Sequence, residues 1–132
     1  MIDGSVEVVR QAYEAYVRGD VATMLEFVDP DLEWTYLDPN LENPEPRVCH
    51  GRDELATVLE RQAKRGLKSE LEEVVGHKER VMVVIHTPGV DAHRVKQSDD
   101  RNYDVLTVRE GHIVAMRACR DRDEAATIAG VM

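Results

Sequence analysis

The sequence predicts a single α+β domain in which three N-terminal helices precede a mostly antiparallel sheet. Up to Gly66 the apolar residues recur every three or four positions, which is the spacing of amphipathic helices. Between about residues 69 and 120 they alternate with a period of two, as in strands. A chain of 132 residues, 42% of them hydrophobic, has room for one core, so the predicted domain spans residues 1–132.

The first two helices are separated by a Gly-Asp corner. The apolar face of the first helix consists of Val6, Val9, Tyr13, Tyr16 and Val17. Gly19 supplies a left-handed stop, and Asp20 can cap a second, shorter helix. From this second helix we expect Met24, Leu25, Phe27 and Val28 to point inward, and Pro30 makes its continuation costly.

A short strand and a long loop are predicted before the third helix. Large residues alternate from Leu32 to Asp38, which places Trp34 and Tyr36 on one side of a strand. Three prolines lie between residues 39 and 50, so this segment is expected to be a loop that could cover the mouth of a pocket. The third helix presents Leu55, Val58, Leu59 and Gln62 inward and closes at Gly66.

The second half of the chain is predicted to be β-rich. Strands are expected at about 69–77, 80–87, 101–109 and 112–120, with a polar turn region around 88–100. Glu110 and Gly111 form a tight hairpin turn between the last two strands. Asp121, followed three residues later by Glu124, resembles a capping box and predicts a short terminal helix that ends near Gly130.

Composition excludes several classes of function. There are 17 basic and 26 acidic residues, and the resulting formal charge of −9 disfavours nucleic acids and anionic membranes as partners. The longest apolar run, from Val81 to Ile85, is far shorter than the roughly 20 residues of a membrane span, and the N-terminus does not resemble a signal peptide. We therefore expect a cytoplasmic protein in which Cys49 and Cys119 are free thiols.

Several motifs resemble one known family. They are the Gly19-Asp20 corner, Asp29-Pro30-Asp31 before a strand with tryptophan, Gly51-Arg52-Asp53-Glu54 at the start of the third helix, and the final hairpin and tail from Val105 to Gly130. This order is similar to that of the SnoaL-like branch of the nuclear transport factor 2-like superfamily. The resemblance implies a cone-shaped α+β barrel, with a strongly curved sheet wrapped by helices around one pocket, and a homodimer. It specifies function poorly, because one scaffold serves many reactions.

Two carboxylates and one tyrosine are the candidate catalytic residues. Asp38 matches the position of the proton-transferring aspartate of similar ketosteroid isomerases, and Asp104 matches their oxyanion-binding aspartate. Such chemistry requires one ionised carboxylate and a second, buried one that stays neutral, which is a worked example of pKa tuning in this family. The matching tyrosine position falls nearest Ala12, so Tyr13 is the candidate. Tyr13 as a core aromatic and Asp38 as a turn former remain the alternatives.

The resemblance also suggests pocket residues and disfavours some activities. Similar cyclases and epoxide hydrolases carry an acid seven residues after the hairpin glycine, where this chain has Ala118. The residues expected to line the pocket are Trp34, Tyr36, His50, His86, Met116, Ala118 and Arg120. For His50 and His86 a structural or solvent-facing role is the alternative, and for Arg120 an ion pair with Asp104 or a surface acid. The histidine spacing predicts no metal site.

Two kinds of function follow from these residues. The first is a cofactor-independent isomerase or cyclase-type enzyme that moves a proton on an apolar, carbonyl-containing molecule such as a polyketide, steroid or terpenoid. Asp38 would be the base, while Asp104 or Tyr13 would polarise the oxygen. The second is a ligand-binding or dimerisation module of the same fold without catalysis, which the alanine at position 118 favours.

Overall fold

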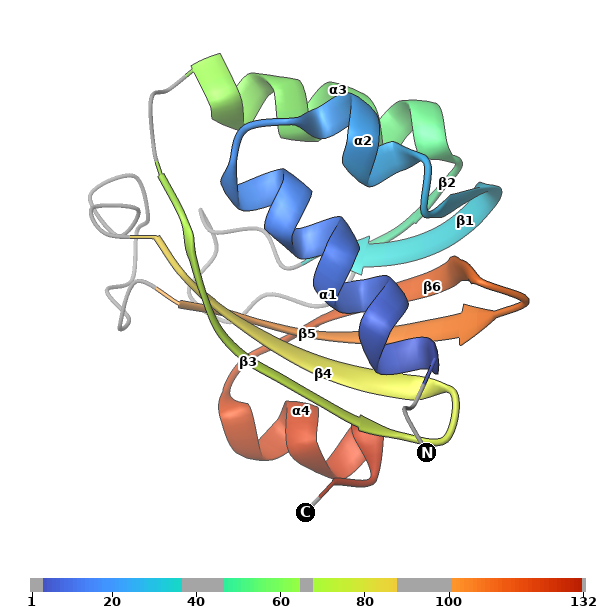
Figure 1. The fold of residues 1–132 in the computed structure, drawn as a ribbon. Helices are drawn as coiled ribbons and strands as arrows, with labels where there is room; N and C mark the ends of the chain where they lie inside the picture. Colours follow the sequence, from blue (N-terminus) through green and yellow to red (C-terminus); the bar gives the residue numbers. More distant parts are fainter. Residues whose placement is uncertain (1–3, 37–46, 65–67, 88–100, 132) are drawn as a thin grey trace.

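The computed structural model describes residues 4–36, 47–64, 68–87 and 101–131. In the described ranges the elements are α1 (Gly4–Val17), α2 (Val21–Leu25), β1 (Val28–Tyr36), β2 (Arg47–His50), α3 (Arg52–Lys64), β3 (Glu70–His77), β4 (Arg80–His86), β5 (Arg101–Arg109), β6 (His112–Cys119) and α4 (Arg122–Ala129). The predicted α+β class, with three helices before most of the sheet, is confirmed (Figure 1). Asp20 and Asp121 cap α2 and α4, as the sequence indicated.

The six strands form one mixed sheet in the order β2-β1-β6-β5-β4-β3. All neighbouring strands are antiparallel except β1 and β6, which run parallel. The end of α2 and the start of β1 differ from the prediction: α2 ends at Leu25, and Val28 already belongs to β1. The amide of Ile113 on β6 donates to the carbonyl of Phe27 at 2.8 Å, which draws the chain into the sheet directly after α2.

The segment predicted as a loop over residues 39–50 contains a strand at its end. Residues 37–46 lie outside the described part of the chain, and Arg47–His50 form β2 at the edge of the sheet. Trp34 on β1 pairs with Cys49, and the amide of Gly51 donates to the carbonyl of Leu32 at 2.7 Å. The prolines end before β2 begins, so nothing in the edge strand itself prevents pairing.

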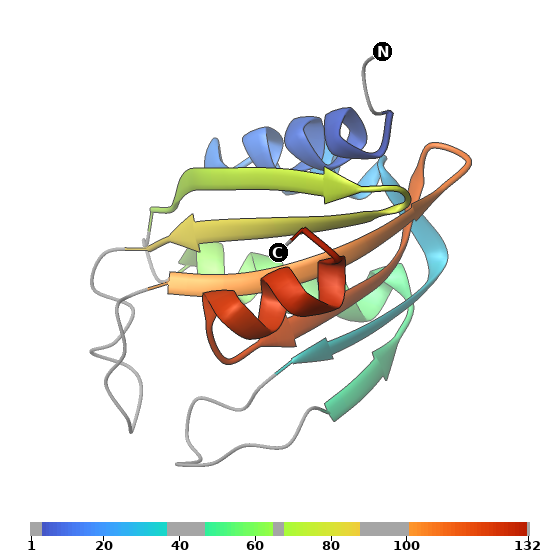
Figure 2. The ribbon, with the colours of Figure 1, turned by 90° about the horizontal axis from the view of Figure 1, so that it is seen from below.

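Helices cover both faces of the sheet. The helices α1, α2 and α3 lie on one face, and α4 lies on the other (Figures 1 and 2). The larger core lies between the sheet and the first three helices, and it includes Val9, Leu32, Leu55, Val81, Val83, Leu106 and Ile113. The smaller core lies under α4 and includes Met82, Val84, Val105 and Ala125. We call the face toward α1–α3 the inner face and the other the α4 face.

A bulge in β3 decides which of its side chains point inward. Val74 pairs with Val83 and Leu71 pairs with Ile85, and the register shifts between residues 71 and 73. Val74 and Leu71 therefore both pack against the inner core, although their odd spacing would separate them in a regular strand. Without the bulge, Glu70 and Glu72 would face the apolar core.

Candidate functional site

Tyr13 and Asp104, two of the three predicted catalytic residues, meet inside the domain. Tyr13 lies in the middle of α1, and Asp104 lies on β5 opposite Val83, an inner-face residue of β4. The Tyr13 hydroxyl donates a hydrogen bond to Oδ2 of Asp104 at 3.1 Å, and the hydroxyl oxygen of Tyr13 is also 3.7 Å from the sulfur of Met116. Only 3% of the Tyr13 surface is exposed. Helix α1 thus presents a phenol to a carboxylate on the inner face.

Burial shifts the pKa of both groups. It raises the pKa of Asp104 from 3.8 to about 6, although the Tyr13 hydrogen bond acts in the opposite direction. Burial also raises the pKa of Tyr13 well above its usual value, and the charge of Asp104 adds to that effect. Asp104 keeps part of its surface accessible to solvent. The pair can therefore exchange a proton near neutral pH and present either a carboxylate or a carboxylic acid.

Three further predicted residues lie on the inner face beside this pair. Met116 on β6 pairs with Trp34 on β1, and Trp34 is 3% exposed within the inner core. Ala118 lies directly opposite Asp104 in the β5–β6 register. An acid at position 118 would therefore be a cross-strand neighbour of Asp104. Because position 118 is an alanine, Asp104 faces no acidic side chain across the β5–β6 pair at this position.

The structure places His86 and His50 away from Tyr13 and Asp104. His86 shares the α4 face with Met82 and Val84, and its Nδ1 atom is 3.7 Å from Oε2 of Glu70. His50 on β2 pairs with Glu33, and its Nε2 atom lies 3.9 Å from Oε2 of Glu33, with both side chains more than half exposed. Neither histidine contributes a proton carrier to the Tyr13–Asp104 pair.

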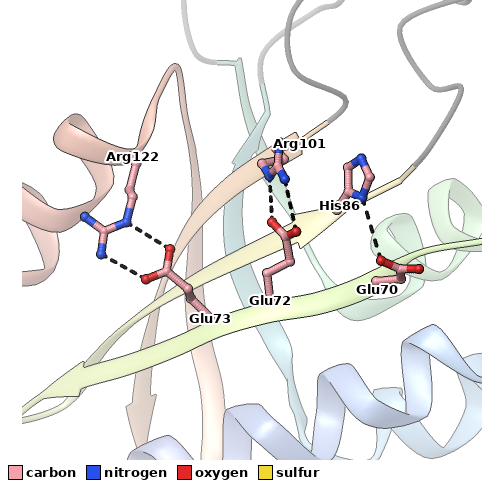
Figure 3. A network of polar contacts seen from close by, with 6 residues as sticks. All are labelled: Glu70, Glu72, Glu73, His86, Arg101 and Arg122. Carbon is pink, nitrogen blue, oxygen red and sulfur yellow. Dashed lines mark hydrogen bonds and ion pairs between the residues drawn. The ribbon is translucent and has the colours of Figure 1, made fainter.

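The His86–Glu70 contact belongs to a row of ion pairs on the α4 face (Figure 3). In this row Arg101 contacts Glu72 at 2.6 Å, and Arg122 contacts Glu73 at 2.9 Å. The pairs link β3 to β4, β5 and the start of α4. Partly exposed ion pairs of this kind each contribute about 0 to 1 kcal/mol, so we assign the row a structural role.

The remaining predicted residues are described only in part. Asp38 lies outside the described residues, and so does the side chain of Tyr36, whose backbone ends β1 opposite Arg47. Arg120 follows the last residue of β6 and is exposed. Among the residues described, Tyr13, Asp104, Met116, Ala118 and Trp34 are the predicted site residues that the fold brings together on the inner face.

Three further polar residues lie near the same pair: Tyr16, which the sequence placed only on the apolar face of the first helix, and Ser69 and Thr87, which the sequence analysis did not single out. Tyr16 follows Tyr13 by one helical turn, and its ring packs edge-on against that of Tyr13, with the centroids 6.1 Å apart. Ser69 and Thr87 flank the β3–β4 hairpin, and their hydroxyl oxygens are 2.7 Å apart. In the sequence, Ser69 and Thr87 stand at the ends of two predicted strands, which is the only indication that they could meet. The bulge in β3 decides that these two residues lie side by side.

Other features give no alternative centre in the described ranges. No group of three or more His, Cys, Asp or Glu side chains there is arranged to hold a metal ion. No helix in these ranges is long and apolar enough to cross a membrane. An open surface depression is lined by Asp29, Glu79, Val108, Arg109, Glu110, His112 and Val114. It lies at the end of the sheet that carries the β3–β4 and β5–β6 turns, away from Asp104.

The N-terminal helices and the mixed six-stranded sheet have the NTF2-like α+β fold. The family model of the SnoaL-like domain matches residues 9–116, and the chain belongs to this family. The match ends at Met116, so it includes Tyr13 and Asp104. A comparison with curated protein sequences finds no significant match.

Solved structures share the fold at low sequence identity. An NTF2-like protein from Burkholderia thailandensis is 22% identical, with a TM-score of 0.71, and the alignment covers 99% of this chain and 98% of that one. A candidate polyketide cyclase from Xanthomonas campestris pv. campestris is 23% identical, with a TM-score of 0.61 and coverage of 98% and 97%. TerC, co-crystallized with polyporic acid, is 15% identical, with a TM-score of 0.68 and coverage of 97% and 99%. At these identities the similarity establishes the fold.

Proposed function

We propose that the protein binds a small, apolar, carbonyl-bearing molecule on its inner face and moves a proton on it without a cofactor. The observation that carries this proposal is the 3.1 Å hydrogen bond from Tyr13 to Asp104 within the apolar core. Burial of two polar groups in apolar surroundings costs free energy, which their mutual hydrogen bond offsets. A buried titratable group with a shifted pKa is a candidate for the recognition of a polar ligand atom. The proposal requires a sheet that bends enough for its inner face to enclose a ligand, as in a cone-shaped barrel.

The chemistry follows from the two states of Asp104. In its neutral form, favoured by burial, the carboxyl group can donate a hydrogen bond to a carbonyl oxygen, and the Tyr13 hydroxyl can donate a second. Both hydrogen bonds strengthen as negative charge develops on that oxygen, which stabilises an enolate. Asp38 is the proposed base that removes the proton from the neighbouring carbon. Two structurally similar proteins, a candidate polyketide cyclase and TerC co-crystallized with polyporic acid, support an oxygenated ring system as the ligand.

A non-catalytic binding module is the second candidate, and Ala118 favours it. This alanine lies opposite Asp104, where an acid would provide a second proton carrier beside the first. If Asp38 does not act as a base, the inner face would bind its ligand without turning it over.

Hydrogen exchange on simple ketones tests the proposal without knowledge of the substrate. The protein should accelerate the replacement of α-hydrogens by deuterium in 1-tetralone or 2-tetralone in D2O, followed by NMR. Tyr13→Phe and Asp104→Asn should each slow this exchange by about 100-fold. One control is Tyr103→Phe, because Tyr103 directly precedes Asp104 on β5 but its side chain lies on the α4 face. The other control is Asp29→Asn, because Asp29 lies at the far end of the sheet.

The outcomes separate the two candidates. Binding of the ketones by calorimetry, with exchange no faster than in buffer, would favour the binding module. Absence of both binding and exchange would overturn the proposal.

We also propose a homodimer formed through the α4 face of β1, β2 and β6. Helix α4 packs on β4, β5 and β6, and Val48 on β2 is 56% exposed on that side of the sheet. Glu33 on β1 and Arg117 on β6 are exposed on the same side, so two copies related by a twofold axis can place opposite charges together.

A further inference from the structure

A run of hydroxyl groups links helix α1 to the β3–β4 hairpin. Ser69 directly precedes β3 and Thr87 directly follows β4, and their hydroxyl oxygens are 2.7 Å apart. Thr87 is only 5% exposed, and the contact with Ser69 offsets the cost of burying its hydroxyl. A side-chain hydrogen bond joins Ser69 in turn to Tyr16 on α1. We call this run of Tyr16, Ser69 and Thr87 the hydroxyl tie.

The ring of Tyr16 connects the hydroxyl tie to the neighbouring tyrosine of the same helix. Tyr13 and Tyr16 are three residues apart, so their side chains emerge on the same face of α1. The two ring centroids are 6.1 Å apart and the ring planes are inclined by 72°, which is the edge-to-face packing that aromatic pairs favour. A ring that is anchored through its hydroxyl restricts the movement of the ring that packs against it.

The contact between Tyr13 and Asp104 needs such a restriction. Helix α1 packs across β3, β4 and β5, so the distance from Tyr13 to Asp104 on β5 varies with the position of the helix over the sheet. The hydrogen bond of 3.1 Å is already at the long end of the range for a hydroxyl donor. The sulfur of Met116, a much weaker acceptor, lies 3.7 Å from the same hydroxyl. A small movement of the ring would therefore exchange a strong acceptor for a weak one.

We propose that Tyr16 is a positioning residue, which holds the Tyr13 hydroxyl on Asp104. The hydroxyls of Ser69 and Thr87 fix Tyr16 to the sheet, and its ring limits the movement of its neighbour. The effect on catalysis rests on the proposed function, whereas the effect on the Tyr13–Asp104 contact needs only the folded chain. Because a displacement of about 1 Å can slow a reaction about 100-fold, the hydroxyl tie contributes to the rate without contacting the reacting atoms.

The groups around Asp104 determine how its titration reports this contact. Tyr13 and Tyr16 face Asp104 from α1, and burial together with the charge of Asp104 raises the pKa of both phenols. Across the neighbouring strands Asp104 lies opposite Val83 on β4 and Ala118 on β6, neither of which titrates. The thiol of Cys119 lies near it on β6, and burial keeps that thiol protonated by raising its pKa to about 12. A change in the titration of Asp104 near neutral pH therefore reports its contacts with α1.

The acid dissociation constant of Asp104 can be measured in the absence of any ligand. A pH titration of the side-chain carboxyl carbon by carbon-13 NMR provides it, with the signal assigned through Asp104→Asn. Burial raises the pKa of Asp104 and the Tyr13 hydrogen bond lowers it, so Tyr13→Phe should lower the dissociation constant about tenfold. Tyr16→Phe and Ser69→Ala should each lower it about threefold to tenfold, because the Tyr13 ring then loses its support.

A double-mutant cycle separates positioning from a direct effect of the Tyr16 hydroxyl on the charge of Asp104. In a Tyr13→Phe background, Tyr16→Phe should change the dissociation constant by less than about twofold, because the contact that it supports is already absent. The matched control is Thr107→Val, which removes a hydroxyl of β5 on the α4 face, opposite Ala115, and should leave the constant unchanged. An effect of Tyr16→Phe that persists undiminished in the Tyr13→Phe background would overturn the inference.

The exchange of ketone α-hydrogens distinguishes this inference from the proposed function. Where the unmodified protein catalyses exchange, Tyr16→Phe should slow it about tenfold. Absence of exchange, together with the expected changes in the titration of Asp104, would support the positioning role and count against the proposed reaction. Exchange and titration that both stay unchanged in Tyr16→Phe and Ser69→Ala would overturn the positioning role and leave the proposed function intact. Melting curves establish that each variant is folded, and Ser69→Ala serves if Tyr16→Phe does not fold.

Discussion

At the scale of single residues, the environment of Asp104 determines how the protein responds to pH. Burial raises the pKa of its carboxyl to about 6, whereas the unfolded chain releases the same proton near the ordinary value of 3.8. Between these values the folded state holds more protons than the unfolded state. The contribution of this group to the free energy of unfolding is therefore present at pH 4 or below and is lost as the pH rises through 6.

Replacement of Asp104 by asparagine should remove this dependence. The amide oxygen can still accept the Tyr13 hydrogen bond, but the residue no longer titrates. We compare the free energy of unfolding of Asp104→Asn with that of the unmodified protein. As the pH rises from 4 to 7, the difference should shift in favour of the variant by on the order of 2 to 3 kcal/mol. Urea unfolding at several pH values measures this difference, with Asp29→Asn as the control. A difference that stays constant across this range would contradict the pKa assigned to Asp104.

The predicted site could be read from the sequence only in part. Tyr13 was selected from helical spacing and resemblance although it is one position from the expected tyrosine, and the structure places its hydroxyl on Asp104. The faces of His50 and His86 could not be read in the same way. His86 lies on a strand whose alternation is visible in the sequence, whereas the segment that carries His50 was predicted as a loop. The pairing of His86 with Glu70 and of His50 with Glu33 fixes which side of the sheet each histidine occupies.

At the scale of elements, the C-terminus of α4 shows how one backbone position fixes the docking of a helix. Gly130 has a φ of 76°, and its amide bonds back to the carbonyls of the last helical turn. A Cβ atom at this position would lie 3.2 Å from Cδ2 of His77 at the end of β3. Arg80 also donates to the carbonyl of Ile128 at 2.9 Å. These contacts hold α4 against the hairpin of β3 and β4.

Gly130→Ala should therefore destabilise the protein by about 1 to 2 kcal/mol, because it adds left-handed strain to a steric contact. In a His77→Ala background the contact disappears and the strain remains, so the cost should become smaller without vanishing. Thermal and urea unfolding measure both values. Gly4→Ala is the control, since Gly4 begins α1 with open space around it. An equal cost in the two backgrounds would show that His77 does not constrain this turn.

At the scale of the whole molecule, α4 covers only part of its face of the sheet. It packs on β4, β5 and β6, and the sheet continues beyond them through β1 to β2 at the edge. The net charge of −9 opposes association, so an interface between copies needs apolar area and local charge pairing. Val48, Glu33 and Arg117 provide these on the proposed surface.

Sedimentation should give the mass of two 15.0 kDa chains, and Val48→Arg should shift it to the mass of one. Two introduced arginines facing each other near a twofold axis repel, and they also remove apolar contact. Val75→Arg is the matched control, because Val75 is the other exposed large hydrophobic residue in the described ranges and lies on β3, away from β1 and β2. A single-chain mass for the unmodified protein would contradict the dimer.

The local order of the fold was determined by the sequence itself. Helical periodicity, the Asp20 and Asp121 caps and the Glu110–Gly111 turn act over a few residues. The structure places α1, β5, β6 and α4 where these signals indicated, and α2 begins directly after its predicted cap. Tertiary structure alone decided the parallel pairing of β1 with β6, the edge strand β2 and the inner-face position of Ser69. A regular hairpin closed at Lys78 and Glu79 would pair Ser69 with residue 88, whereas the bulge between Leu71 and Glu73 places it beside Thr87. Such register depends on packing between distant segments, and a shift of one residue moves every following side chain to the other face.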